Sequence, residues 1–225
     1  MTILNEIVIQ KREASDTRAI EALRGLPTSV IGDVMGGRLV GTTALRPINR
    51  SPVSVCGNAF TVRVRSGDNL LIHKALDLLE HGDILVVDGE GDTSRALVGE
   101  IMMTYALMRG AMAFVMDGAI RDVNAFEEKC FPCWSRGVSL RGPYKDGPGS
   151  INVPVTVGGM VVNPGDVVVG DSDGVIAVPK HLAIKVATLA NTKVHHERTT
   201  IAAIKAGTYS TAWVDAALES TGRLE

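Results

Sequence analysis

Three charged side chains have types and a spacing that could carry out chemistry together. Glu100 follows Gly99 at the predicted start of a helix, and Arg121 and Asp122 follow the next buried strand, with twenty residues between Glu100 and Arg121. That length covers about one helix, one turn and one strand, and α/β folds place ligands at the loops after strands. We therefore expect Glu100, Arg121 and Asp122 to meet at the end of a strand.

The chemistry of these groups is complementary. The main-chain N–H groups of Ile101 and Met102, at the predicted helix start, suit a carboxylate. Arg121 offers a planar pair of donors to carboxylate or carbonyl oxygens, and Asp122 can hold a hard divalent cation. Together the groups suit a small oxo-acid. In a simpler alternative, Arg121 and Asp122 form only an ion pair at a strand end, and Asp122 caps the helix after it.

The elements that position these side chains follow from the hydrophobic pattern. Alternating helical and strand-like runs favour a parallel or mixed sheet covered by helices. In the first half of the chain we predict helices over Ser15–Leu26 and Thr28–Met35. Thr28 and Ser29 would cap the second of these helices, and Gly36 and Gly37 would end it. We then predict, in order, a half-buried strand over Val53–Arg65, helix Leu70–Leu79, strand Ile84–Val87, helix Gly99–Arg109, strand Ala113–Met116 and helix Val123–Glu128.

Beyond Val138 the pattern changes to strand-like runs separated by Gly, Pro and Asp, which favours a second, antiparallel layer. These runs are Val153–Val157, Met160–Val162, Val167–Val169 and Val175–Val178. A long helix over residues 180–206 follows and could reach a neighbouring subunit. We predict one domain over residues 1–225, with N-terminal helices in 13–36, a core over 53–179 and this C-terminal helix.

Composition narrows the classes of function. The chain has 225 residues, 45% of them hydrophobic, and a formal net charge of −2. This charge leaves no basic surplus for nucleic acid, and no apolar run reaches the roughly 18 residues of a membrane span. The N-terminus lacks a signal-peptide pattern, so we expect a cytoplasmic protein without nucleic-acid or membrane partners.

Other motifs carry weaker signals. Cys130 and Cys133 have the spacing of a redox pair but a strand-like sequence after them, and the acidic loop from Asp88 lacks the glycine spacing of a nucleotide site. His195 and His196 point about 100° apart on a helix, so we interpret them as surface histidines. Asp83 and Asp166 follow glycines before valine-rich strands, which indicates turn chemistry.

The spacing of Glu100, Arg121 and Asp122 within Gly99–Val123 resembles the acidic-x20-Arg-Asp signature of class II pyruvate aldolases in the RraA-like superfamily. The likeness extends to SGDN (66–69), HGDILVVDGEGD (81–92), SRGVS (135–139) and NPGDVVVGDSDGVIAVP (163–179). It covers most of the chain from about Thr28 to Gly207. The chain departs from the pattern at Glu100, where members often have Asp.

The resemblance implies an α/β fold, namely a layered β/β/α swivelling domain that assembles as a trimer or a pair of trimers with the site at a subunit interface. It also implies Mg²⁺ or Mn²⁺ held by Asp122, with water and substrate as the other ligands. The Gly99–Met102 loop, including Glu100 and Ile101, would bind the substrate's carboxylate end, and Arg121 its oxo group.

The roles of three further residues are less direct. Asn69 could hydrogen-bond a substrate oxygen, although an Asn in such a turn is often satisfied by its own backbone. Asp33 and Glu197 resemble, by position only, acidic residues that reach the aldolase site from a neighbouring subunit. A solvated helix face is the alternative for both.

The implied function is a metal-dependent lyase that cleaves a 4-hydroxy-2-oxo acid, such as 4-hydroxy-4-methyl-2-oxoglutarate, to pyruvate. An enolate would be stabilised by the metal and Arg121, with Glu100 acting through a water as base and oxaloacetate decarboxylation as a side activity. Two alternatives stay open. One is a non-catalytic RraA-type regulator that inhibits a ribonuclease, and the other is a different metal-enolate enzyme acting on an oxo-acid.

Overall fold

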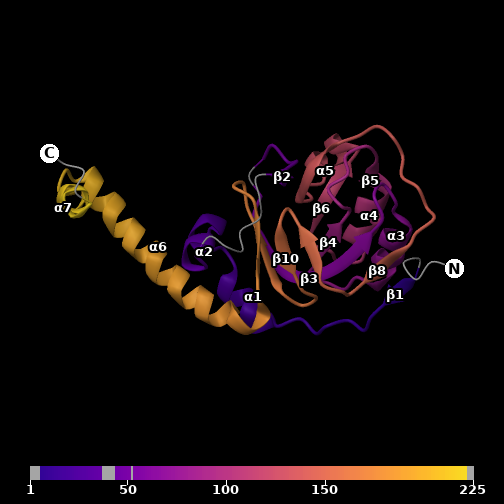
Figure 1. Cartoon of the computed structure of the whole chain (residues 1–225), viewed down its shortest axis with the longest axis horizontal. Coiled ribbons are helices and arrows are strands. Elements are labelled where there is room, and N and C mark those ends of the chain that lie inside the picture. Colours follow the sequence, from indigo (N-terminus) through magenta and orange to yellow (C-terminus); the bar gives the residue numbers. More distant parts are fainter. Residues whose placement is uncertain (1–5, 37–43, 52, 222–225) are drawn as a thin grey trace.

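The computed structural model describes residues 6–36, 44–51 and 53–221 (Figure 1). Its centre is a mixed sheet, and the helices lie on both sides of it. Gly37, one of the two predicted helix-ending glycines, lies outside the described residues.

The middle of the sheet is parallel, as the alternating pattern predicts. Its neighbouring strands are β3 (Val55–Val64), β4 (Asp83–Asp88), β6 (Ala113–Ile120) and β7 (Cys133–Val138), with the short β5 (Ala96–Val98) beside the end of β6. The connecting helices are α3 (Leu70–Leu78), α4 (Glu100–Met108) and α5 (Val123–Glu128). Parallel order aligns the carboxyl ends of these strands, which is where the candidate residues lie.

The strands after residue 148 depart from the prediction of a separate antiparallel layer. Only β9 (Val155–Val157) and β10 (Met160–Val162) form a second, two-stranded sheet. The start of β3 pairs with β11 (Val167–Gly170), which pairs with β12 (Val175–Val178), and the end of β3 pairs with β8 (Gly149–Ile151). The sheet ends at β1 (Ile7–Ile9), beside β8, and at β2 (Arg46–Pro47), beside β7. The ten-residue β3 is long enough for both partners to pair along one edge. β8, β11 and β12 therefore belong to the main sheet and not to a separate layer.

The prediction that β3 is half-buried is wrong, because both of its faces are covered. Every residue from Val55 to Val62 is buried, and Arg63 alone within the strand is exposed. One face packs with α3, α4 and α5, and the other packs with the β11–β12 side of the molecule and the N-terminal helices. The inward polar group of Thr61 donates a hydrogen bond to the Val153 carbonyl at 2.6 Å.

The N-terminal helices pack beside the C-terminal helix. Asp16 caps α1 (Thr17–Leu23) by accepting a hydrogen bond from the Ala19 N–H. The short 3₁₀ turn η2 (Lys180–Leu182) leads into α6 (Ala183–Lys205), which packs against α1 and α2 (Thr28–Val34) and then extends away from the body (Figure 1). An unpredicted helix, α7 (Ala212–Ser220), lies at its far end.

The predicted cap of α2 by Thr28 and Ser29 is wrong. The N-cap position is Pro27, which provides no side-chain acceptor. Instead, the carboxylate of Asp171, in the turn after β11, accepts hydrogen bonds from the Thr28 N–H at 2.8 Å and the Thr28 hydroxyl at 2.7 Å. Asp171, 143 residues from Thr28 in sequence, therefore supplies the acceptor that we had assigned to the local side chains.

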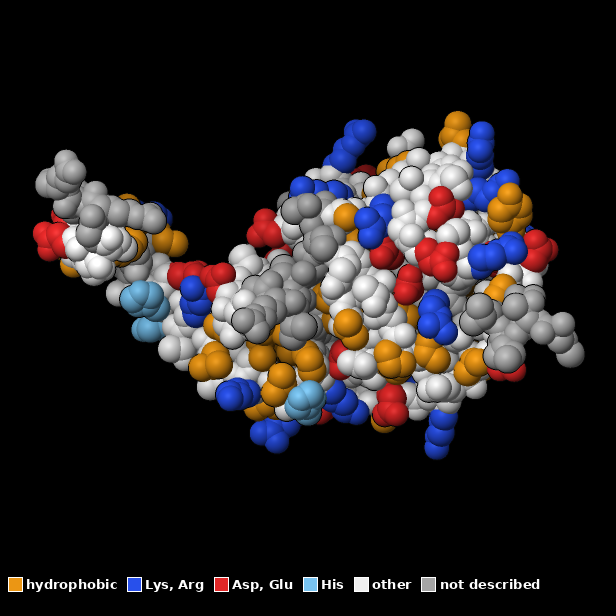
Figure 2. All heavy atoms as spheres, viewed as in Figure 1, with side chains coloured by type: hydrophobic (Ala, Val, Ile, Leu, Met, Phe, Trp, Pro, Cys, Tyr) orange, Lys and Arg blue, Asp and Glu red, His pale blue; other side chains and the backbone are white. Residues whose placement is uncertain are grey.

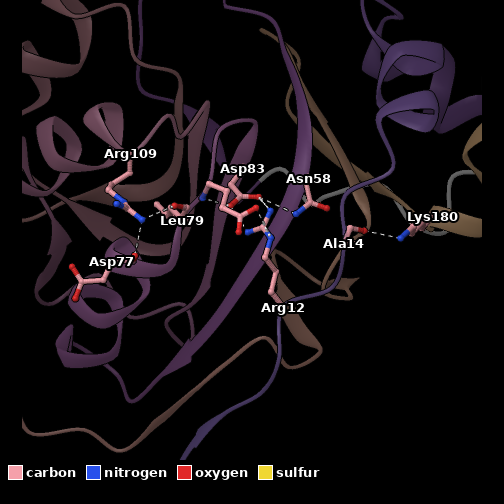
Figure 3. Close-up of polar contacts among 9 residues, drawn as sticks. Arg12, Ala14, Asn58, Asp77, Leu79, Asp83, Arg109 and Lys180 are labelled. Atoms are coloured by element: carbon pink, nitrogen blue, oxygen red, sulfur yellow. Dashed lines mark hydrogen bonds and ion pairs between the residues drawn. The ribbon is translucent and has the colours of Figure 1, made fainter.

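An extended segment from Gln10 to Asp16 lies against the body and is held there by side-chain contacts (Figure 3). Arg12 forms a two-pronged ion pair with the fully buried Asp83, at 2.6 and 2.7 Å, and Lys180 donates to the Ala14 carbonyl at 2.7 Å. Asp83 also accepts from the Glu80 N–H at 2.8 Å, so its predicted role in a turn is confirmed.

The outer surface carries mixed charges. Figure 2 shows acidic and basic side chains interspersed on one face, and hydrophobic side chains gathered over the base of α6, where Ile184 and Leu189 are exposed. No helix within the described residues is long and apolar enough to cross a membrane.

Candidate active site

The predicted residues meet where two strand ends lie side by side. The Arg121 N–H donates to the Val98 carbonyl at 3.0 Å, which joins the end of β6 to the end of β5. Gly99 then leads into α4, while Arg121 and Asp122 lead into α5. Glu100, Arg121 and Asp122 are therefore brought together as the spacing predicts.

Asp122 links the two helix starts. Its Oδ2 atom accepts a hydrogen bond from the Glu100 N–H at 3.0 Å and lies 3.6 Å from Arg121 Nε. Its backbone is left-handed, with φ of 59°, and its side chain makes no capping bond to α5. The alternative that Asp122 caps the next helix is thus wrong, although the ion pair with Arg121 is present. The carboxylate instead binds the positive end of α4.

Gly99 makes this approach possible. A Cβ atom built on Gly99 would lie 2.4 Å from Asp122 Oδ2 and 3.0 Å from Arg121 Cγ. Since the Gly99 φ of −154° is open to any residue, the glycine is needed here for space rather than for backbone freedom. The side chains of Arg121 and Asp122 are each 42% exposed, so the pair stays accessible to a ligand.

A cleft with a volume of about 120 Å³, open to solvent, lies on one side of this pair. Its walls come from β5, the start of α4, the turn before α3 and the loop after β7. The lining residues that bear on its chemistry are Asn69, His73, Gly99, Met102, Arg121 and Lys145. The cleft thus joins the predicted carboxylate-binding helix start to three groups from other parts of the chain.

Asn69 has one satisfied and one unsatisfied end. Its Nδ2 donates to the Leu97 carbonyl at 2.9 Å and contacts Met102 Sδ at 3.4 Å, so the side chain is not satisfied by its own turn. The side-chain oxygen, Oδ1, is buried and has no hydrogen-bond partner among the described residues. The bond to Leu97 fixes the orientation of the amide, because turning it over would place two acceptors together. The atom of Asn69 that lacks a partner is therefore an acceptor.

Sequence reasoning missed His73 and Lys145. His73 lies one helical turn after Asn69, and burial together with the nearby charge of Lys145 lowers the pKa of its imidazole. Lys145 lies in the glycine- and proline-rich loop before β8. The i, i+4 spacing of Asn69 and His73 could have indicated that both face the same way, whereas nothing local connects Lys145 to them.

A second, more open cleft lies on the other side of the Arg121–Asp122 pair. Glu100 lines this cleft together with Arg121, Asp122, Asn124 and Glu128. Apolar side chains at its rim and at the start of α4 are strongly exposed, with Leu140 at 92% and Ile101 at 81%. Glu100 and Asn69 thus flank the pair from opposite clefts.

Asp33 and Glu197 do not line either cleft of the described chain. Asp33 lies on α2 and Glu197 on α6, and both contact Lys193 Nζ, at 3.0 and 3.7 Å. This pairing raises the pKa of Lys193, chiefly through its hydrogen bond to Asp33. Any contribution of these carboxylates to a site would come from a neighbouring subunit, and this stays a prediction.

The donor set at Asp122 fits a hard divalent cation. Its second oxygen, Oδ1, accepts no hydrogen bond from the described residues, and the carboxylate is exposed to both clefts. No group of three His, Cys, Asp or Glu side chains in the described ranges could hold a metal. Mg²⁺ is commonly bound through one or two carboxylates, with water and substrate as its other ligands. Asp122 would be such a single protein ligand.

The weaker sequence motifs lie outside these clefts. Cys133 is buried at the start of β7, and burial raises the pKa of its thiol, which makes it a poor redox nucleophile. His195 and His196 are exposed on α6, as predicted. The Asp88 carboxylate accepts hydrogen bonds from two backbone groups, the Glu90 N–H at 3.1 Å and the Thr156 N–H at 3.3 Å.

Comparison with known sequences agrees with the resemblance to the RraA-like superfamily. Residues 28–177 match the family model described as RraA-like, Aldolase/RraA. A Halalkalibacterium halodurans protein carries the name "Putative 4-hydroxy-4-methyl-2-oxoglutarate aldolase"; it is 42% identical over 161 residues, which are 72% of this chain and 76% of that protein. An Ectopseudomonas mendocina protein with the same name is 34% identical over 128 residues, 57% of this chain and 78% of its own.

Solved structures share the fold. The RNA-processing inhibitor RraA from Thermus thermophilis has a TM-score of 0.61 at 27% identity, over 68% of this chain and 92% of its own. RraAS2 from Streptomyces coelicolor, described as an unusual member of the RNase ES inhibitor RraA family, has a TM-score of 0.77 at 24% identity, over 84% and 98%. These matches confirm the expected α/β fold class, and the family model covers more than half of the chain. The protein therefore belongs to the RraA-like family.

Proposed function

We propose that this protein is a divalent-metal-dependent carbon–carbon lyase that releases pyruvate from a 4-hydroxy-2-oxo acid such as 4-hydroxy-4-methyl-2-oxoglutarate. The observation that carries the proposal is the Asp122 carboxylate, which is bound to the Glu100 N–H and lies beside Arg121 at a point where two clefts meet. The aldolase name of the similar proteins supports it.

The helix start and Arg121 bind the oxo-acid end of the substrate. The N–H groups of Ile101 and Met102 lie in the first turn of α4, where no carbonyl of the helix can accept them, so they are available to the C1 carboxylate. The Arg121 guanidinium donates to the 2-oxo oxygen and stabilises the negative charge that develops there as the C3–C4 bond breaks. A divalent cation held by Asp122 would supply Lewis-acid polarisation of the same oxygens.

Cleavage also requires that the C4 hydroxyl lose its proton. We assign that proton, through a water, to the exposed carboxylate of Glu100. The electron pair of the broken bond forms the enolate of pyruvate, C4 becomes a ketone, and a proton returned to C3 completes the product. With 4-hydroxy-4-methyl-2-oxoglutarate, both products are pyruvate.

The first cleft receives the far end of the substrate. The unsatisfied Asn69 Oδ1 suits a hydrogen-bond donor such as the substrate hydroxyl. The Lys145 ammonium suits the second carboxylate of a dicarboxylic substrate. A neutral His73, favoured by its lowered pKa, can donate or accept without adding charge.

We also propose that a neighbouring subunit completes the site, in a trimer or a pair of trimers. The support is two strongly exposed apolar side chains, Leu140 in the second cleft and Ile101 in the first, which a monomer leaves in contact with water.

Pyruvate release, coupled to lactate dehydrogenase, tests the function. The substrates are 4-hydroxy-4-methyl-2-oxoglutarate and oxaloacetate, with Mg²⁺ or Mn²⁺ and then with EDTA. We expect turnover that EDTA abolishes and that Asp122→Ala reduces by at least about 100-fold, equivalent to about 2.7 kcal/mol. Asp173→Ala, an exposed aspartate in the turn after β11, is the matched control. Absence of turnover with both substrates and both cations would remove the aldolase proposal.

Two other functions keep specific support. The structural match to RraA from Thermus thermophilis favours a non-catalytic regulator of an RNA-processing enzyme. Ribonuclease pull-down that succeeds with both wild type and Arg121→Ala, from a protein without lyase activity, would favour it. The same clefts would also serve another metal-enolate reaction, and turnover of oxaloacetate alone would point to that alternative.

A further inference from the structure

We propose that Asp68 is a positioning residue. It holds in place the loop that carries Lys145 on the wall of the first cleft, and it thereby strengthens the protein's affinity for the far end of the substrate. The proposal rests on the function proposed above. Asp68 is fully buried and is not among the described residues that line either cleft. It therefore acts through its neighbours rather than on the substrate.

The Asp68 carboxylate is the common acceptor for two segments. Its Oδ2 atom accepts hydrogen bonds from the Asp146 N–H at 2.7 Å and the Gly147 N–H at 3.0 Å. Its Oδ1 atom accepts from the Leu70 N–H at 2.9 Å, at the start of α3. The guanidinium of Arg65 lies 3.3 Å from Oδ2 and 3.5 Å from the exposed carboxylate of Asp146. One buried group thus joins the Lys145 loop to the helix that begins beside Asn69.

Backbone pairing continues the same junction. The Tyr144 N–H donates to the Gly67 carbonyl at 2.8 Å, and the Asn69 N–H donates to the Tyr144 carbonyl at 3.0 Å. These bonds make a short parallel bridge between Asp68 and Tyr144. Lys145 is the next residue after this bridge and Asn69 the next after Asp68, so the junction fixes the spacing between the two cleft-lining groups.

Only a carboxylate satisfies this junction. Two oxygens accept three backbone N–H groups from two segments, whereas an asparagine at the same place has one oxygen and directs N–H groups at other donors. A buried donor left without an acceptor is costly, so the loop would move to find water. Arg95 also contacts this loop, donating to the Gly142 carbonyl at 2.7 Å and the Tyr144 hydroxyl at 2.9 Å. Both contacts precede Lys145, so the exposed Lys145 and Asp146 would move most.

The expected effect of Asp68→Asn separates binding from chemistry. We expect the KM for 4-hydroxy-4-methyl-2-oxoglutarate to rise about 10-fold while kcat stays within about 3-fold, because the Arg121–Asp122 pair is untouched. The inhibition constant of oxalate, a two-carbon mimic of the pyruvate enolate that has no far end, should stay unchanged. A general loss of structure would change all three together.

Two comparisons isolate the role of Asp68. Asp166→Asn is the matched control, since Asp166 is also a buried turn aspartate that accepts two backbone N–H groups, from Asn163 at 2.8 Å and Lys180 at 3.2 Å. It should leave the ratio of substrate KM to oxalate inhibition constant unchanged. In a Lys145→Met background the KM effect of Asp68→Asn should disappear, because the ammonium group that Asp68 positions is then absent.

Hydrogen exchange provides a readout that does not need turnover. Asp68→Asn should speed amide exchange at 144–147 and not in the Asp166 turn, and Asp166→Asn should do the reverse. Tyr144→Ala, which removes an exposed ring stacked 3.9 Å from Arg95, offers a milder disturbance of the same loop if Asp68→Asn does not fold. We expect it to speed exchange at 144–147 and raise the KM in the same direction.

The outcomes distinguish the two proposals. If wild type turns over no substrate, the lyase proposal fails, and exchange at 144–147 still decides whether Asp68 holds the loop. If wild type is active and Asp68→Asn changes neither exchange at 144–147 nor the KM, the positioning role is overturned. Equal KM effects in the Lys145→Met and wild-type backgrounds would overturn it as well.

Discussion

Asp122 combines a left-handed backbone with a carboxylate directed at a helix other than the one it begins. A non-glycine residue in this conformation costs about 1–3 kcal/mol, and such residues gather at functional sites. The sequence could predict that Glu100, Arg121 and Asp122 meet, because the element lengths between them are regular. It could not predict which helix Asp122 contacts, because that depends on the Asp122 φ and on the space left by Gly99.

The Gly99 contact leads to a direct prediction. Gly99→Ala places a methyl group where Asp122 Oδ2 lies, so the carboxylate must leave the Glu100 N–H. We expect kcat/KM for pyruvate release to fall at least about 10-fold, about 1.4 kcal/mol, with little change in Tm. Gly137→Ala is the control, because its added Cβ would meet nothing closer than 3.7 Å. Equal activity in both variants would contradict the account of Asp122.

The role assigned to Glu100 separates two reactions. Aldol cleavage needs a base for the C4 hydroxyl, whereas decarboxylation of oxaloacetate releases CO₂ and needs none. Glu100→Gln should therefore lower kcat for aldol cleavage by about 100-fold, within the range of general-base effects, and lower oxaloacetate decarboxylation much less. Glu100→Asp should retain most of both activities. Parallel losses of the two activities in Glu100→Gln would show that Glu100 does not act as the base.

At the scale of elements, local patterns predicted the identity of most helices and strands but not their partners. The helices α3, α4 and α5 lie within one residue of their predicted limits. The separate antiparallel layer was wrong because β3 pairs on one edge with both β8 and β11, a choice set by strands about 90 to 110 residues away in sequence. Lys145 was missed for the same reason, since its place in the cleft comes from contacts with Gly67–Asn69.

The distant cap of α2 can be tested by stability. Asp171→Ala removes the acceptor of the Thr28 N–H and hydroxyl, together with that of the Asp173 N–H within the turn, and we expect a loss of about 1–2 kcal/mol in the free energy of unfolding, as for other helix caps. Urea denaturation measures this loss. Asp173→Ala, in the same turn but with an exposed side chain, should change stability by less than about 0.5 kcal/mol. A loss below about 0.5 kcal/mol in Asp171→Ala would show that the distant acceptor does not stabilise the protein.

For the whole molecule, the sequence predicted an α/β fold with a long C-terminal helix, and both are present. The prediction of a single domain over residues 1–225 stays a prediction. The outer half of α6 and α7 extend from the body with Ile201, Ile204 and Trp213 exposed, which a single chain leaves uncovered (Figure 1). Neither the predicted trimer nor the interface site can be derived from one chain, because the residues that would meet lie on different copies.

Mixing of subunits tests the interface site. If Glu197 acts on a neighbouring copy, then Asp122→Ala and Glu197→Gln chains, each weakly active alone, should regain activity when unfolded and refolded together. Mixed oligomers would contain sites with Asp122 from one chain and Glu197 from the other. Light scattering should give a mass of three or six times the 23.8 kDa chain. Oligomers of the predicted mass that regain no activity on mixing would place Glu197 outside the site.

The central claim is that the Arg121–Asp122 pair stabilises the enolate of a 2-oxo acid. Its most direct measurement is the exchange of pyruvate methyl protons with D₂O, followed by proton NMR, because pyruvate alone requires no knowledge of the substrate's far end. We predict exchange with Mg²⁺ or Mn²⁺ in wild type and in Asp173→Ala, and none with EDTA or in Asp122→Ala. Absence of exchange in wild type with either cation, or equal rates in wild type and Asp122→Ala, would contradict the claim.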